Sequence, residues 1–206
     1  MRTALVLLRH EVRLVASLWL WAIRRRHGVG DGDGIGYGYS RGQGTMMLGF
    51  GFVIVIESIM MSVLLRNYPA VQRGWFMVDM YTLVIIIGMH AASVVRPHVL
   101  DAGYLRIRRA AHVDLRIPLE KIAHVRRELR TTHERADGEL NLAIGAQTTL
   151  TLELTEPVAH FTFLGRRRDV RLVRFHADDS DSLVQTVVRA VKQARTAPSA
   201  LPDLPV

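Results

Sequence analysis

The sequence predicts an α+β membrane protein, in which a transmembrane helical hairpin precedes a seven-stranded antiparallel β-barrel or sandwich capped by a C-terminal helix. Two observations carry this prediction. Most apolar residues gather in two windows, 45–65 and 75–95, and after Pro97 the apolar period changes from helical to two. The chain of 206 residues is long enough for one or two domains. Its net charge of +8 is uneven, and the first 44 residues are the most basic per residue.

The first 27 residues predict an amphipathic helix that lies in the headgroup plane of a bilayer. Its early arginines fall on one helical stripe and its apolar residues lie largely elsewhere, which suits an interfacial helix on anionic lipid. Two alternatives stay open, a distorted third span from Leu14 onward and a helix packed on the β domain. The arginines that would face the headgroups are Arg9, Arg13, Arg24, Arg25 and Arg26.

Residues 28–44 contain eight glycines, which predicts a flexible linker. Two sharper interpretations fail on spacing. A calcium loop starting at Asp31 would have Gly42 where a bidentate Glu is needed, and a dinucleotide-binding loop needs a preceding strand. The chain should thus pass through this segment directly into the first span.

Windows 45–65 and 75–95 are each long enough to cross a membrane. A helix of 21 residues is about 31 Å long, close to the roughly 30 Å of a hydrocarbon core. The short connection, 66–74, makes the helices antiparallel neighbours. Two arginines lie in this connection and four lie near each outer flank. By the positive-inside rule, both termini are predicted to be cytoplasmic, at a bacterial plasma membrane.

Three polar residues interrupt the spans: Glu57, Asp79 and His90. Glu57 lies near mid-span, where an unpaired carboxylate is costly. The predicted antiparallel register places it near 81–84, so Tyr81 or Thr82 would be its hydrogen-bond partner. Three roles stay open: a protonated structural residue, a contact to a partner protein's span, or an ion or proton relay. A relay would need an oligomer, because two helices enclose no pathway.

Residues 98–195 alternate apolar and polar side chains over short segments separated by turn signals, which predicts a β domain. Each apolar face needs a partner layer, so a small sandwich or barrel follows. The predicted strands include residues 105–107, 113–117, 123–131, 140–144, 150–154, 161–163 and 170–175. An amphipathic helix over 183–191 covers one end. The proline-containing tail, 196–206, is predicted to be disordered.

The order of these segments resembles the bacterial membrane-anchored PH-like proteins, in which a helical hairpin precedes a PH-type barrel with a C-terminal helix. The resemblance covers roughly residues 45–195. It rests on DAGYLRIRR, ELNLAIGAQTTLTLELTEP and above all the phrase Ile117-Pro-Leu-Glu-Lys-Ile122. It implies a fold and a membrane location and carries no catalytic residue. Arginine makes up almost all of the cations, which is typical of a high-GC bacterium such as an actinobacterium.

Sequence motifs favour binding over catalysis. The chain has no cysteine, which excludes thiol chemistry, and its histidines and serines show no metal-ligand or nucleophile spacing. We therefore expect no cofactor, no metal site and no enzymatic activity. Nucleic acid is not expected as a partner, because the basic residues are not interleaved with exposed aromatics.

Three arginine groups of the β domain are candidate binding residues for an anionic surface. They are Arg106, Arg108 and Arg109, then Arg126 and Arg127, then Arg166, Arg167 and Arg168. The predicted function is a membrane-tethered binding or scaffold module, with anionic lipid or a protein partner as its ligand. The alternative is an accessory subunit of a membrane complex, or a homo-oligomer, that makes its contact through the hairpin and Glu57.

Overall fold

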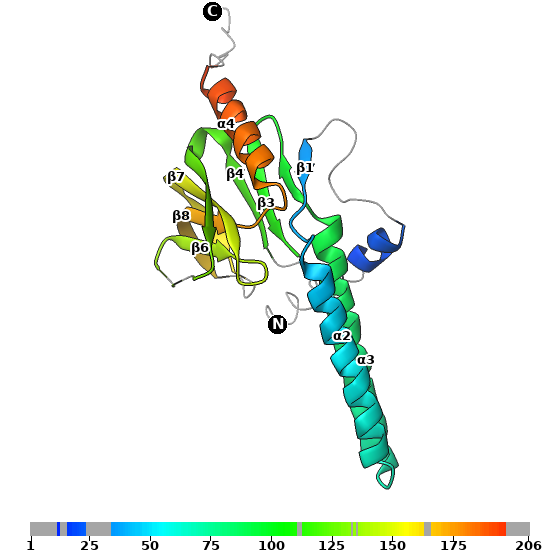
Figure 1. Cartoon of the computed structure of the whole chain (residues 1–206). Coiled ribbons are helices and arrows are strands. Elements are labelled where there is room, and N and C mark those ends of the chain that lie inside the picture. Colours follow the sequence, from blue (N-terminus) through cyan, green and yellow to red (C-terminus); the bar gives the residue numbers. More distant parts are fainter. Residues whose placement is uncertain are drawn as a thin grey trace, which may run out of the picture.

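A computed structural model describes residues 12, 16–23, 34–110, 113–132, 134, 136–162 and 166–196. It has two parts: a pair of long antiparallel helices, and a β-rich domain with a terminal helix at one end of that pair (Figure 1). The order of apolar hairpin, β domain and C-terminal helix is as the sequence predicted.

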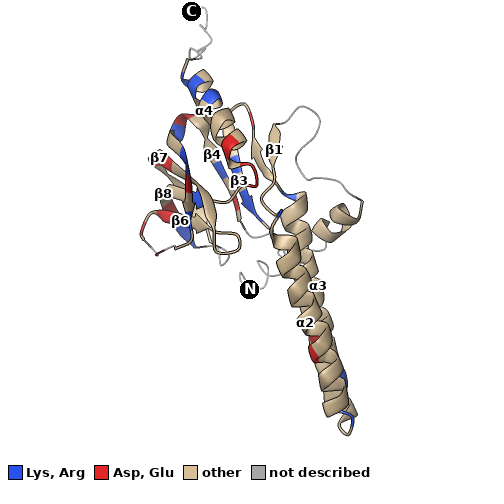
Figure 2. Ribbon diagram, viewed as in Figure 1, with Lys and Arg blue, Asp and Glu red and all other residues tan. Residues whose placement is uncertain are grey.

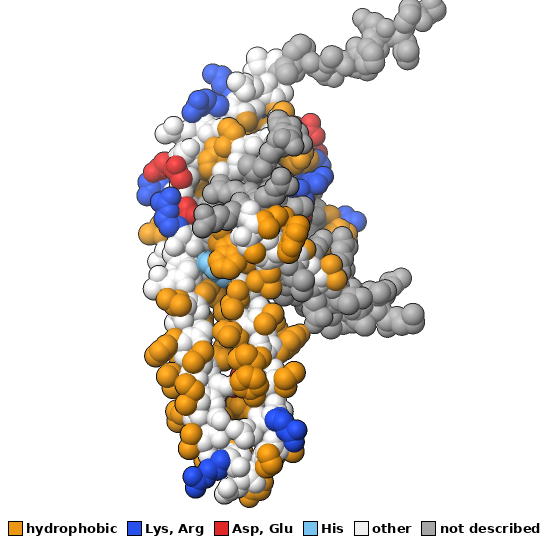
Figure 3. Space-filling model, turned by 90° about the vertical axis from the view of Figure 1, so that its right-hand side faces the viewer, with side chains coloured by type: hydrophobic (Ala, Val, Ile, Leu, Met, Phe, Trp, Pro, Cys, Tyr) orange, Lys and Arg blue, Asp and Glu red, His pale blue; other side chains and the backbone are white. Residues whose placement is uncertain are grey.

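The hairpin consists of α2 (Gln43–Leu64) and α3 (Pro69–Val95). Both are long and apolar enough to cross a membrane, with mean hydropathies of 2.2 and 1.8. Apolar side chains cover most of the face of the hairpin shown in Figure 3, and cations lie at its loop end. The predicted connection over 66–74 is too long. Proline is favoured in the first turn of a helix, so Pro69 begins α3 directly after a short turn.

The early start of α3 also changes the register of the hairpin. Gly44 packs against His90, Gly51 packs against Leu83, and Gln72 bonds Ser62. The residue numbers of all three pairs add to the same value, so the register is constant and places Glu57 level with Met77. The predicted position near residues 81–84 is therefore wrong by about one to two helical turns.

The β domain contains two four-stranded sheets. In the first the order is β1 (Ile35–Tyr37), β2 (His98–Leu100), β3 (Tyr104–Arg109) and β4 (Val113–Pro118). A short 3-10 turn, η1 (Leu119–Lys121), leads to the second sheet. Its order is β5 (Ile122–Arg130), β7 (Thr148–Phe161), β8 (Arg167–Phe175) and β6 (Glu139–Leu142).

This arrangement corrects the strand prediction in two ways. Eight strands are present among the described residues rather than seven, because β1 and β2 were not predicted and two predicted strands form the single strand β7. The pairing is not wholly antiparallel, because β6 pairs with β8 in parallel. No closed barrel forms within the described part of the chain, in which the strands divide into two separate sheets.

Strand β7 is a single long strand, whereas the sequence predicted a turn at Glu156-Pro157. Its register against β8 shifts between Glu153 and Val158. A proline cannot donate to the ladder and is tolerated at such irregularities. The bulge therefore accommodates Pro157 without ending the strand.

Strand β1 lies within the segment predicted to be a flexible linker. Gly34 has a φ of +84°, and a Cβ there would lie 2.6 Å from the carbonyl oxygen of Leu100. Glycine is needed at this point because the chain approaches β2 too closely for a side chain. Since β1 precedes α2 and β2 follows α3, the pairing places both flanks of the hairpin on the same side of any membrane that it crosses.

One apolar core joins the two sheets to α4 (Ser180–Thr196). The inward positions of β3, β4 and β7 are fully buried, as their alternation predicted. Helix α4 contributes Leu183, Val187 and Val191, but Val188 is half-exposed. The predicted apolar face of this helix is therefore only partly covered.

Candidate functional site

The hairpin and the β domain meet at a buried polar contact, which we call the junction and define by Tyr39, Ala92, His98, Ala110 and Asp178. The Tyr39 hydroxyl accepts a hydrogen bond from the backbone N–H of Ala110, with an N···O distance of 2.8 Å. The Tyr39 ring stacks on His98, with ring centroids 4.7 Å apart. Ala110 packs on Ala92 of α3, so the turn after β3 lies directly against the hairpin.

His98 is held in one tautomer within the junction. Its Nδ1 accepts a hydrogen bond from the backbone N–H of Arg108 at 3.1 Å. Its Nε2 therefore carries the proton and donates it to the carbonyl oxygen of His176 at 2.9 Å. Burial lowers the pKa of His98 to about 4 and raises the pKa of Tyr39 to about 12. Both groups are neutral at physiological pH, so the junction is a structural contact rather than an acid–base pair.

Asp178 ties the start of α2 to the segment between β8 and α4. Its two carboxylate oxygens accept the backbone N–H of Arg41 at 3.1 and 3.3 Å. Its own N–H donates to the carbonyl oxygen of Gly38 at 2.9 Å. A Cβ at Gly38 would lie 2.9 Å from the Asp178 carboxylate, so a side chain there would displace this carboxylate. The β domain is thus fixed to both helices of the hairpin.

A short helical segment over residues 16–22 also reaches the junction. Arg96 donates from Nε to the hydroxyl of the buried Ser17 at 3.2 Å. Trp21 makes an edge contact with His90, with ring centroids 6.4 Å apart. The candidate interfacial residues Arg9, Arg13, Arg24, Arg25 and Arg26 lie outside the described residues.

The first arginine group does not form a solvated surface. Arg108 is buried and Arg109 half-buried, and burial lowers the pKa of both. Arg106 forms a bidentate ion pair with Asp114 across β3 and β4. The Nε of Arg108 is 4.0 Å from the same carboxylate, so its side chain lies on the same side of the strand as that of Arg106, but it is covered there rather than solvated.

The other two arginine groups lie on separate elements, and most of their charges are paired. Arg126 pairs with Glu128 and Glu153, and Arg127 pairs with Asp181 of α4. In the third group, Arg167 pairs with Asp169. Acidic and basic residues accordingly alternate over the domain in Figure 2.

The third group, Arg166, Arg167 and Arg168, is exposed. It lies at the opposite end of β8 from the junction, about 26 Å away along an extended strand. The three arginine groups therefore do not combine into one basic surface.

A groove of about 310 Å³ runs between β5 and α4, and the sequence did not predict it. Its walls combine apolar side chains with the cationic Lys192 and Arg195. Arg195 donates to the carbonyl oxygen of Ile122 at 2.8 Å, which fixes one end of the groove. The lining residues are Ile122, Ala123, His124, Val125, Val188, Val191, Lys192, Arg195 and Thr196.

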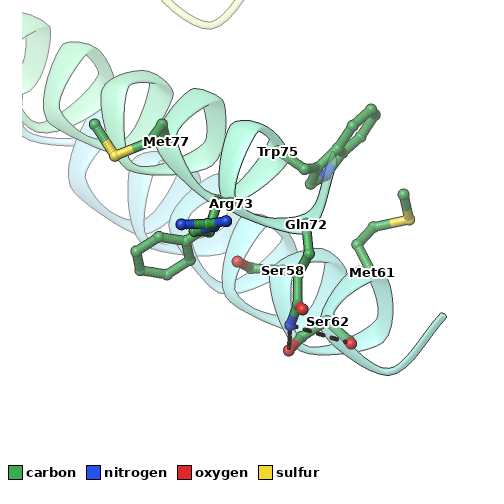
Figure 4. A pocket seen from close by; sticks show the side chains of 8 residues that line it. Ser58, Met61, Ser62, Gln72, Arg73, Trp75 and Met77 are labelled. Carbon is green, nitrogen blue, oxygen red and sulfur yellow. Dashed lines mark hydrogen bonds between the residues drawn. The ribbon is translucent and has the colours of Figure 1, made fainter. Parts of the chain in front are cut away.

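A second cavity, of about 400 Å³, opens between α2 and α3 near the loop of the hairpin (Figure 4). Gln72 crosses its floor and donates from Nε2 to the Ser62 hydroxyl at 2.8 Å. Its lining residues are Ser58, Met61, Ser62, Gln72, Arg73, Trp75, Phe76 and Met77. The loop half of the hairpin is therefore partly polar between the helices.

The three polar residues of the spans are not brought together. Asp79 is buried, and its Oδ2 has no hydrogen-bond partner in the described part of the chain. Glu57 is exposed and makes no hydrogen bond or ion pair to any described residue. The Thr82 hydroxyl, one expected partner of Glu57, donates instead to Val78 O within its own helix. His90 lies beside Trp21 near the junction.

Among the described residues there is no cluster of histidine and carboxylate side chains that could hold a metal ion. Comparison with family models, curated proteins and solved structures found no match to this chain. The architecture of a hairpin followed by a β domain stands on the structure alone, and the resemblance to PH-like proteins remains a prediction.

Proposed function

We propose that the protein is a membrane-anchored binding module of the PH-like type, whose groove between β5 and α4 holds an extended, acidic segment of a protein partner. The observation that carries the proposal is the groove itself, which combines an open strand edge, apolar walls and two cations. The cavity between α2 and α3 is lined mainly by residues of the hairpin's loop half and offers no strand edge.

The chemistry of the groove favours an extended peptide. Strand β5 is an edge strand, paired only with β7 among the described strands, so its outer edge can accept a further strand. Val125, Val188 and Val191 offer apolar contacts for alternate side chains. Lys192 and Arg195 favour carboxylates on the ligand.

The position of the groove favours a protein over the bilayer as ligand. Helix α4 starts beside the junction and points away from the hairpin (Figure 1). The groove residues Val188 to Thr196 lie about 12 to 24 Å along this helix from Ser180. Because the junction fixes the β domain to both helices, the groove is presented at a constant height and orientation above the membrane.

Peptide binding by the full chain in lipid nanodiscs tests this proposal. The probes are two labelled peptides of ten residues, one alternating Val and Glu and one alternating Val and Lys. We expect the acidic peptide to bind at least tenfold more tightly by fluorescence anisotropy, and Lys192→Glu to abolish that preference. Arg189→Glu is the matched control, because Arg189 is exposed on the same helix outside the groove. Equal binding of the two peptides, or an equal loss of acidic-peptide binding in both variants, would rule out the groove as the binding site.

Anionic lipid headgroups are the second candidate ligand, because Arg166 and Arg168 are exposed and have no carboxylate partner within the described residues. This alternative predicts that nanodiscs of the full chain bind anionic vesicles in a salt-dependent manner. The double variant Arg166→Gln, Arg168→Gln should then lose the interaction, while Lys192→Glu should keep it.

A further inference from the structure

The two membrane helices differ in how much of their surface the chain covers. Helix α3 buries six residues, among them Asp79, Gly88 and Ala92, against α2 and the β domain. Helix α2 buries none over its 22 residues. Most of α2 therefore remains open to lipid or to another protein.

Glu57 lies on this open surface. It is about 10 Å along α2 from Leu64 and about 21 Å from Gln43. By helical position it shares one face with Phe50, Val53, Met60 and Leu64. These four apolar residues are exposed, at 52%, 60%, 66% and 71% respectively. A carboxylate on such a face is costly in lipid unless another group pairs with it.

The described residues of the hairpin offer no cation at the depth of Glu57. Windows 45–65 and 74–89 contain no Lys, Arg or His. Arg73 lies about one helical turn closer to the loop than Met77, and its Nε donates to the carbonyl oxygen of Pro69. A second copy in the same orientation would bring the same residues at the same depths. Self-association therefore does not supply an opposite charge.

We propose that the outer face of α2, centred on Glu57, binds a transmembrane helix of another protein that carries one Lys or Arg at the depth of Glu57. The ion pair and its hydrogen bonds form within the low dielectric of the bilayer, where opposite charges attract strongly. Gly49 lies beside this face, four residues before Val53, and a Cβ there would have no neighbour within 4 Å outside its own helix. Small residues of this kind let two helix backbones approach closely.

Asp79 provides the contrast within the same hairpin. It is a carboxylate at nearly the same depth as Glu57, but the seam between α2 and α3 buries it. A partner helix that packs on the outside of α2 cannot reach it. Removing the charge of Asp79 should therefore leave partner binding intact, which makes Asp79 the matched control for Glu57.

The test measures energy transfer in lipid bilayers between the labelled full chain and synthetic helices of 21 Leu and Ala residues. One helix carries a Lys at the depth of Glu57, one carries Leu there, and one carries the Lys two turns away. We expect the first helix to associate at least tenfold more strongly than the other two. Glu57→Gln should reduce it to the level of the Leu helix, and Asp79→Asn should leave it unchanged.

Equal association of all three helices, or loss of the difference in Asp79→Asn alone, would overturn the proposal. Counting the photobleaching steps of single labelled chains tests whether a second copy of this chain occupies the face instead. Dimers that Glu57→Gln abolishes would assign the face to a second copy instead. Circular dichroism must show native helix content in each variant, and Glu57→Asp, which keeps the charge, should retain part of the preference if the ion pair is correct.

Discussion

The hairpin and the β domain use the same residue types in opposite places. In the β domain the buried positions are large and apolar, such as Leu105, Ile107 and Leu152, and none of these is exposed. In α3 the buried positions are small or polar, such as Gly88, Ser93 and Asp79, while Val53 and Met77 of the hairpin are exposed. Large apolar residues are thus buried in the β domain and exposed on the hairpin.

The comparison shows what holds each part together. The β domain is stabilised by removing apolar area from water. The hairpin cannot use this force within a bilayer, so its helices depend on close packing of small residues and on a few polar contacts. The junction links the two parts through hydrogen bonds, and these do not depend on which solvent surrounds the apolar surface.

The largest expected effect is a core truncation in the β domain. Leu152→Ala should lower the free energy of unfolding of the β domain by about 2–5 kcal/mol, because the cavity removes both transfer energy and contacts. Hydrogen exchange of the β7 amides, measured for the full chain in nanodiscs, reports this value. Val53→Ala in the exposed face of α2 should change it by less than about 0.5 kcal/mol. A similar loss of unfolding free energy in both variants would show that the two parts are not stabilised in different ways.

Acid should weaken the junction through His98. The unfolded chain takes up a proton near the ordinary pKa of 6.5, whereas burial keeps His98 neutral until about pH 4. The unfolded state therefore binds more protons between these values, and stability falls as the pH drops from 6.5 to 4, by on the order of 3 kcal/mol.

Hydrogen exchange of the β2 and β3 amides between pH 6.5 and 4 measures how steeply stability falls with pH. His98→Gln offers a neutral side chain and should remove this part of the pH dependence. A variant that keeps the full slope would show that other groups cause it.

A smaller effect is expected from the link between the two parts. Tyr39→Phe leaves the buried N–H of Ala110 without its acceptor, which costs about 1–3 kcal/mol. Because the chain has no cysteine, spin labels can be placed freely at Leu64 and Arg189. The distance distribution between them should broaden in Tyr39→Phe and stay narrow in Tyr104→Phe, which lies away from the junction. An unchanged width in Tyr39→Phe would show that Tyr39 does not hold the two parts together.

Sequence patterns predicted those features that depend on neighbours in the chain. Both spans, the alternation of β3, β4 and β5, and α4 follow from local periods of apolar residues. The early start of α3 was also readable, since Pro69 is a favoured first-turn residue. A prediction that starts α3 at Pro69 shortens the turn and places Glu57 closer to its observed level beside Met77.

Features that depend on distant contacts were not readable. Strands β1 and β2 are three residues each, too short for a period, and they exist because they pair across the whole hairpin. The burial of Arg108 depends on Tyr39 and His98, which are far from it in sequence. The groove forms because α4 approaches β5. The exposure of Glu57 depends on the register of the hairpin. Neither feature follows from composition.

The pairing of β1 with β2 has a consequence for how the protein is made. If both helices cross a membrane, the ribosome releases β1 first, then α2 and α3, and only then β2, so the first sheet can form only after both helices have been integrated. A chain that integrates only one helix leaves the two strands in different compartments. Strand β2 would then keep an open edge, which promotes aggregation and exposes the nascent chain to proteolysis. Completion of this sheet therefore acts as a built-in check that membrane insertion has succeeded.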